Sequence, residues 1–215
     1  FRRVLFRSGH SFIIECDHKN LSFMANSMTP KVIRWGLQIQ ELDRVQSQEG
    51  TAVIPHNTHV KGAYLVTSYY SDGVVVHDAH DPSNLIKLGS FDTYPGQTPG
   101  FDGCWGVYPF FASNKAVAAD ITEGLFVLQI NYAPAATLVG VVKDLVSGQE
   151  LAQVSVSLLG AAMSEKTNAQ GVYKTGMATS GTYVVEVNKP GYYPQTVQVS
   201  LIEGTTTTQN FNLLP

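Results

Sequence analysis

Histidine and carboxylate side chains gather between positions 56 and 81. All six histidines of the 215-residue chain lie between positions 10 and 80. His56, His77 and His80 are candidate metal ligands, because imidazole and carboxylate bind several divalent ions. Strand alternation, however, places His77 and Asp78 on opposite faces. The run from Asp78 to Asn84 fits a strand end and a proline turn, in which aspartates bond nearby backbone N–H groups. We therefore expect structural capping and no cofactor, with a metal site as the alternative.

Aromatic residues form a second group of candidates, because aromatic platforms with polar edges bind sugars or partner proteins. In the first half of the chain they are Tyr69, Tyr70, Tyr94, Phe101, Trp105 and Tyr108. The alternative is that Trp105 and Tyr108 fill the space between neighbouring sheets. Tyr192 and Tyr193 follow Pro190 and Gly191, and we expect them to pin that turn to a core.

Catalytic motifs are missing from the sequence. It contains no GxSxG, HExxH, P-loop or dinucleotide fingerprint. His10 and His56 each open a repeat, and we expect them to tether strands by hydrogen bonds, since a general base would need a nucleophile or a carboxylate beside it. The sequence favours a non-enzymatic role, with a site assembled from scattered loops as the alternative.

Composition excludes two further classes of function. Charged residues make up 14% of the chain, and the net charge of −3 comes without any basic block. Nucleic-acid binding is therefore not expected. No apolar run approaches the roughly 18 residues that cross a bilayer. The two cysteines, Cys16 and Cys104, show no metal spacing, which leaves a disulfide or two buried free thiols.

A repeated pattern between Gly9 and Ile130 predicts short strands. Three glycines, Gly36, Gly73 and Gly124, each open an alternating apolar run, with spacings of 37 and 51 residues. These spacings bracket the length of a four-stranded propeller blade. Within the repeats we expect strands at 59–68, 73–78, 116–120 and 124–130, with turns between them. The pattern predicts about three blades of an incomplete propeller.

The stretch from His56 to Leu128 resembles the LVIVD-repeat proteins, whose longer members carry the choice-of-anchor B domain. It contains GVVVHDAHDP, FDTYPG, GCWGVYP and DITEGLFVL in the order found in that family. The resemblance implies a β-propeller displayed at the cell surface. A closed propeller needs at least about four blades, so we expect blades to be missing before Gly9.

After a Pro/Ala linker, residues 138–215 alternate strictly between apolar and polar. One face carries Leu138, Val142 and, further on, Val185 and Val187, with turns every 8 to 12 residues. This pattern predicts six or seven strands in a β-sandwich. The words LVGVVKD, TNAQGVY and GTY resemble the carboxypeptidase regulatory-like domain, a transthyretin-type sandwich, with Asn168 where that family usually has Asp.

The predicted fold is all-β, an incomplete propeller followed by a seven-stranded sandwich. Residues 1–8 (FRRVLFRS) resemble a translated sequencing adapter and are interpreted as an artefact or tail. Residues 9–132 are assigned to the propeller, 133–137 to the linker and 138–215 to the sandwich. We expect an extracellular or cell-surface interaction protein whose propeller binds a protein or glycan. The alternatives are a fragment of a metal-dependent or hydrolytic surface enzyme, with its site in missing blades, and a carbohydrate-binding sandwich.

Overall fold

The computed structural model describes residues 41–48, 50–96, 100–159 and 164–215. Every regular element among them is a β-strand, which confirms the all-β prediction, and none is a helix that could span a membrane. The chain divides into two units, Phe1–Arg44 and Val45–Pro215, and the strands that the structure describes lie in the second. The predictions for residues 1–8, the Gly9 and Gly36 repeats, His10 and Cys16 fall outside the described residues.

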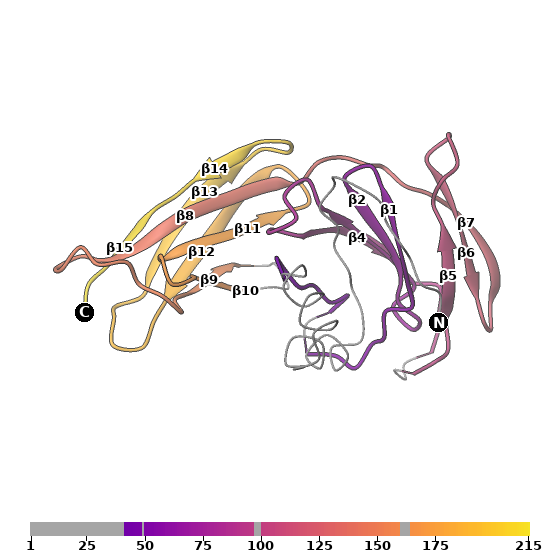
Figure 1. Cartoon of the computed structure of the whole chain (residues 1–215), viewed down its shortest axis with the longest axis horizontal. Coiled ribbons are helices and arrows are strands. Elements are labelled where there is room, and N and C mark those ends of the chain that lie inside the picture. Colours follow the sequence, from indigo (N-terminus) through magenta and orange to yellow (C-terminus); the bar gives the residue numbers. More distant parts are fainter. Residues whose placement is uncertain (1–40, 49, 97–99, 160–163) are drawn as a thin grey trace, which may run out of the picture. The chain divides into compact units, whose positions relative to one another are not determined.

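The first sheet is antiparallel and follows chain order. Its strands are β1 (Asn57–Lys61), β2 (Tyr64–Ser68), β3 (Val74–Asp78) and β4 (Ile86–Phe91) (Figure 1). The stretch 59–68, predicted as one strand, is instead a hairpin, because Gly62 adopts a positive φ of 62° and lets the chain reverse between β1 and β2. All five residues of β3 are buried, so this strand is covered on both faces.

The second sheet has three antiparallel strands, β5 (Cys104–Tyr108), β6 (Lys115–Asp120) and β7 (Gly124–Gln129). One of its faces shares an apolar core with the first sheet. That core contains Val66, Val74, Val76, Cys104, Val107, Ala116, Ala118 and Ile130. Residues 57–91 and 104–129 therefore fold into two separate sheets that pack against each other.

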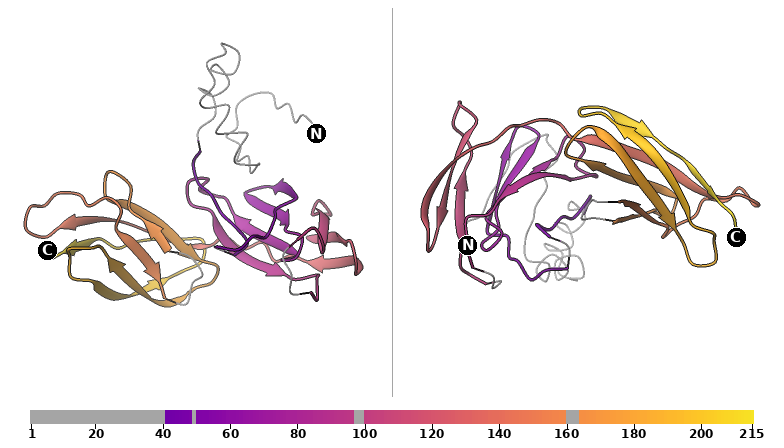
Figure 2. Two further views of the ribbon diagram at one scale, coloured as in Figure 1. Left: turned by 90° about the horizontal axis from the view of Figure 1, so that it is seen from below. Right: turned by 180° about the vertical axis from the view of Figure 1, so that it is seen from behind.

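The remaining strands form two sheets. One has the order β10 (Ser164–Lys166), β9 (Ser155–Leu158), β12 (Gly181–Asn188) and β13 (Gln195–Leu201). The other has β11 (Val172–Met177), β8 (Ala136–Asp144) and β14 (Thr206–Thr208), with β15 (Phe211–Leu213) also on β8. These sheets face each other across a single core, as the orange-to-yellow ribbons show (Figure 2).

The alternation in this region predicts the buried face correctly. Leu138, Val142, Val185 and Val187 are all fully buried in that core. Two details differ from the sequence prediction. The structure has eight strands, because the last segment pairs with β8 in two short stretches separated at residues 209–210, and β8 begins at Ala136 rather than at Leu138.

His77 is the only histidine in the described chain that is buried in a sheet interior. His77 is the register partner of Leu65 on β2 and of Lys87 on β4, and its Nε2 has no hydrogen-bond partner among the described residues. Burial, followed by the positive charge of Lys87, lowers the pKa of His77 to about 4 from 6.5. The folded protein therefore holds this imidazole neutral.

We expect acid to destabilise the protein through His77. Between pH 6.5 and 4 the unfolded chain binds the proton more readily, so the free energy of unfolding falls as the pH falls. At about 1.4 kcal/mol per pKa unit, the loss is on the order of 3 kcal/mol. Urea unfolding at pH 7 and pH 4 should show that His77→Leu removes this loss. The control His59→Gln should change it less, because burial also lowers the pKa of His59 but that side chain is only partly covered. Equal pH dependence of His77→Leu and the unsubstituted protein would contradict the prediction.

Candidate functional site

The predicted aromatic residues divide into buried and exposed ones. Tyr69 and Tyr70 are buried, and Tyr94 is partly buried. Trp105 and Tyr108, at the two ends of β5, are 51% and 52% exposed. Because half of each side chain faces solvent, they do not simply fill the space between sheets. The candidate binding surface therefore centres on β5.

A cluster of rings surrounds Trp105. Its indole lies 4.4 Å from the imidazole of His56 between ring centres, and 6.1 Å from Tyr70 in an edge-to-face arrangement. Tyr70 also meets the edge of Phe101 at 5.5 Å, and Phe101 is 70% exposed. Such pairs stabilise one another beyond their buried area. We call His56, Tyr70, Phe101 and Trp105 the Trp105 cluster.

Two backbone features hold the Trp105 cluster in place. The register of β5 shifts between Cys104 and Gly106, so Trp105 is the extra residue of a β-bulge, a device that redirects a side chain. Gly103, with a positive φ of 97°, lies so close to the carbonyl of Tyr70 that a Cβ would overlap it. That approach allows the N–H of Cys104 to bond the Tyr70 oxygen at 2.8 Å.

A second ring cluster lies beyond the other end of β5. Tyr108 contacts Phe110 and Phe111 at 5.4 and 5.3 Å between ring centres, and Phe110 meets His59 at 5.5 Å. The ammonium of Lys61 bonds the carbonyls of residues 109 and 111, which fixes this turn. Phe110 and Phe111 were not among the predicted site residues, although their place in the run Tyr-Pro-Phe-Phe was a visible signal.

The three histidines considered as metal ligands lie in different surroundings. His56 stacks on Trp105, His77 is buried in the first sheet, and His80 bonds Asp78. No group of three or more His, Cys, Asp or Glu side chains in the described part of the chain is arranged to hold a metal ion. The ring of His56 makes aromatic contacts, and it is the backbone N–H of His56 that bonds across to the oxygen of Ser68.

A hollow of about 350 Å³ lies where residues 78–86 meet residues 134–206. Asp78 organises it. One carboxylate oxygen accepts the backbone N–H of His80 at 2.8 Å and contacts the His80 ring at 2.7 Å, while the other accepts the N–H of Ala135 at 2.6 Å. The predicted capping role of Asp78 is thus confirmed, and this carboxylate also joins the first sheet to the start of β8.

A second polar group lines the same hollow. The Lys174 ammonium lies 2.7 Å from the carboxylate of Asp81 and 2.6 Å from the Ser83 hydroxyl. Burial raises the pKa of Asp81, but hydrogen bonds from Lys174 and Ser83 outweigh it and hold the pKa below its ordinary value. These polar contacts link β11 to the turn after β3.

Cys104 is a free thiol buried in the core between the first two sheets. Burial, followed by the charge of Asp120, raises the pKa of this thiol to about 11. Because the thiolate is the reactive form, Cys104 is inert near neutral pH.

Comparison with known proteins identifies the C-terminal part. The family model of the carboxypeptidase regulatory-like domain matches residues 137–214. This match confirms the resemblance inferred for that half of the chain. No curated protein matches the chain. The LVIVD resemblance of the first half stays a prediction.

Solved structures give only distant similarities. GBS52, the minor pilin of Streptococcus agalactiae, is 14% identical with a TM-score of 0.33, over 50% of this chain and 62% of its own. Chlorocatechol 1,2-dioxygenase from Pseudomonas putida is 12% identical with a TM-score of 0.33, over 41% and 63%. The group B streptococcus pilus 2b backbone protein is 11% identical with a TM-score of 0.32, over 76% and 81%. The chain thus spans less than two thirds of the length of the first two.

We expect Asp78→Asn to destabilise the protein by about 1 to 3 kcal/mol, because the amide must turn an N–H₂ group toward one of two backbone donors. Urea unfolding at neutral pH measures the change. Asp92→Asn is the matched control: Asp92 is exposed and accepts one bond, from the N–H of Tyr94, which an asparagine oxygen can also accept. The control should change stability by less than about 0.5 kcal/mol. Equal losses of stability in the two variants would show that the hydrogen bonds of Asp78 do not stabilise the fold.

Proposed function

We propose that this chain is a non-catalytic interaction module of an extracellular or cell-surface protein, in which residues 56–132 bind a protein or glycan. The exposed Trp105 cluster supports this proposal most directly. It combines a half-exposed indole and an exposed Phe101 with the nearby polar residues Asn57 and Asp102. Flat apolar rings bordered by hydrogen-bonding groups suit the faces and hydroxyls of sugars, and they also serve as anchors in protein interfaces.

The first two sheets are proposed to be blades of an LVIVD-type propeller. They share a core, as neighbouring blades do. Their hairpins correspond as well, since β3 follows Gly73 and β7 begins at Gly124, and both glycines have a positive φ. On this assignment β1 and β5 are equivalent strands, and both carry rings of the exposed aromatic surface.

Residues 136–215 are proposed to form a transthyretin-type sandwich that acts as a spacer. Their apolar side chains are used in one closed core, and their polar turns are satisfied locally. The Tyr192 hydroxyl bonds Asp144, which fixes it to the end of β8. Tyr193 is exposed, but the structure brings no ring cluster around it, so an aromatic binding platform is better supported in the first half.

Binding by the Trp105 cluster can be tested with the whole chain on a glycan array and against purified surface proteins. Trp105→Ala should weaken binding of any positive ligand roughly 30-fold, about 2 kcal/mol, as expected for a central aromatic anchor. Tyr193→Ala removes an even more exposed ring far along the chain and should leave binding unchanged. Circular dichroism should show that both variants keep their sheet content.

The outcomes separate the candidate functions. Retention of binding in Trp105→Ala together with its loss in Tyr193→Ala would transfer the site to the carbohydrate-binding sandwich. Loss in neither variant would exclude both aromatic sites. Stoichiometric metal in the purified protein, lost on substitution of His77 and His80, would favour the surface enzyme instead.

A further inference from the structure

Among the described residues, the edge strand β7 pairs with another strand on one side only. It pairs with β6 from Gly124 to Gln129, and the sheet order β5, β6, β7 leaves its other edge open. In the first sheet the corresponding strand, β3, is flanked by β4. The second sheet therefore ends one strand earlier than the first among the described residues.

Backbone geometry identifies the groups on this open edge. The N–H of Ile130 bonds the oxygen of Asn114 at 3.0 Å, so position 130 faces the β6 side. Backbone groups alternate in direction along an antiparallel strand. Leu125, Val127 and Gln129 therefore direct their N–H and C=O groups away from β6. Three donors and three acceptors stand in a row at the spacing that another strand requires.

The two edge strands of the first sheet, β1 and β4, carry protection that β7 lacks. β4 contains the charged Lys87, and its pairing with β3 shifts register at Val76 and His77. β1 ends at Lys61, whose ammonium is anchored to the turn after β5. Lysines and bulges discourage edge-to-edge pairing. The sequence GLFVLQ has no charge or proline, and its register with β6 is unbroken.

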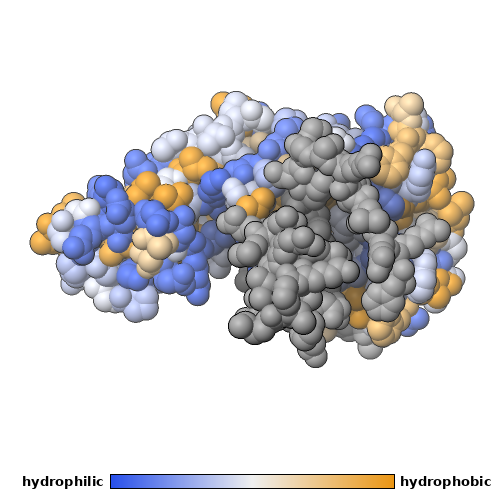
Figure 3. Space-filling model, in the orientation of Figure 1, coloured by the Kyte–Doolittle hydropathy of each residue, from blue (hydrophilic) through white to orange (hydrophobic). Residues whose placement is uncertain are grey.

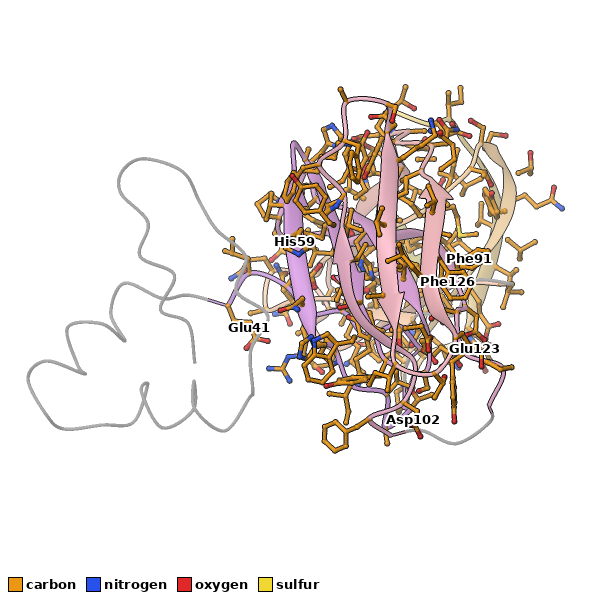
Figure 4. All side chains as sticks on the ribbon, turned by 90° about the vertical axis from the view of Figure 1, so that its right-hand side faces the viewer. Glu41, His59, Phe91, Asp102, Glu123 and Phe126 are labelled. Carbon is orange, nitrogen blue, oxygen red and sulfur yellow. The ribbon has the colours of Figure 1, made fainter. Side chains whose placement is uncertain are left out.

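The side chains of β7 favour association as well. Leu125 and Val127 are 69% and 65% exposed on one face, while Phe126 packs on the opposite side against the core. Orange apolar residues are interspersed with white and blue ones along the right-hand edge of the space-filling view (Figure 3), and the face of the sheet is turned to the viewer in Figure 4. Contiguous exposed apolar surface of this kind marks interaction sites.

We propose that β7 pairs antiparallel with β7 of a second copy of this chain, joining two three-stranded sheets into one. With Phe126 on the two-fold axis, Leu125 lies opposite Val127 of the second copy, and the outward backbone groups of both face each other. The exposed side chains of one copy then lie on the same face of the joined sheet as the exposed side chains of the other copy, and they contact each other across the two strands. The sequence of β7 favours this register, because Leu125 and Val127 have both the outward backbone groups and the exposed apolar side chains.

Charge complementarity supports a second copy as the occupant. Lys115 is paired with Gln129 at one end of the hairpin, and Glu123 lies in the turn at the other end. Antiparallel pairing brings Glu123 of each copy to the end that holds Lys115 of the other. No like charges come together at the joint, and the arrangement is closed by its symmetry.

Light scattering on the intact chain tests the pairing. We expect a mass that rises with concentration from 23.4 kDa toward twice that value. Val127→Pro should hold the protein at the monomer mass, since proline removes an outward N–H without removing a bond to β6. Val127→Lys provides a second disruption if the proline variant misfolds. Val117→Thr, on the same exposed face but on the central strand, should still dimerise.

A covalent trap tests the register. Directly opposite residues in a hydrogen-bonded antiparallel pair lie about 5.5 Å apart at Cα, which suits a disulfide. The double variant Leu125→Cys and Val127→Cys should give a covalent dimer under mild oxidation, while Val127→Cys alone should not. A monomer at every concentration would overturn the proposal. So would dimerisation that Val117→Thr abolishes and Val127→Pro leaves intact, because that result assigns contact to the sheet face.

Discussion

Burial of apolar side chains between facing sheets is the interaction on which the rest of this structure depends. A strand with one apolar face is stable only when another layer covers that face, because the hydrophobic contribution scales with the area removed from water. β8 meets this condition through the core it shares with β12 and β13, and β3 meets it on both faces. The ring clusters and the polar ties occupy the margins of these cores.

Polar groups in the core margins are arranged around carboxylates. Asp78 and Asp81 each accept backbone or side-chain donors, and Asp120 does the same in the turn before β7. A carboxylate with several such donors fixes a turn more firmly than one neutral acceptor, because charge-assisted bonds are the stronger ones. The turns that set the ends of the strands are therefore well defined, and the exposed rings of β5 are attached to a rigid support.

Sequence patterns predicted the strands well and the site only in part. Alternation identifies the buried face of β8 and β12 residue by residue, because each side chain there points either to the core or to water. It could not reveal that 59–68 is a hairpin, since Gly62 is a single residue in an otherwise uniform run. Nor could it show that Tyr70 is buried and Trp105 exposed, because the exposure of Trp105 depends on the bulge in β5. Phe110 and Phe111 were missed for a similar reason: their exposure depends on a turn held by Lys61, 48 and more residues earlier in the chain.

The parallel pairing of the last strands with β8 has a mechanical consequence. β14 and β15 each pair at three positions along β8 in the same direction, so the first and last strands of residues 136–215 lie side by side. Tension applied to the two ends of this segment would pull these strands past each other lengthwise. All the bonds between them would then carry the load together, instead of breaking one after another from an end. A segment whose first and last strands pair in parallel therefore resists stretching between its termini far better than a hairpin of equal length would.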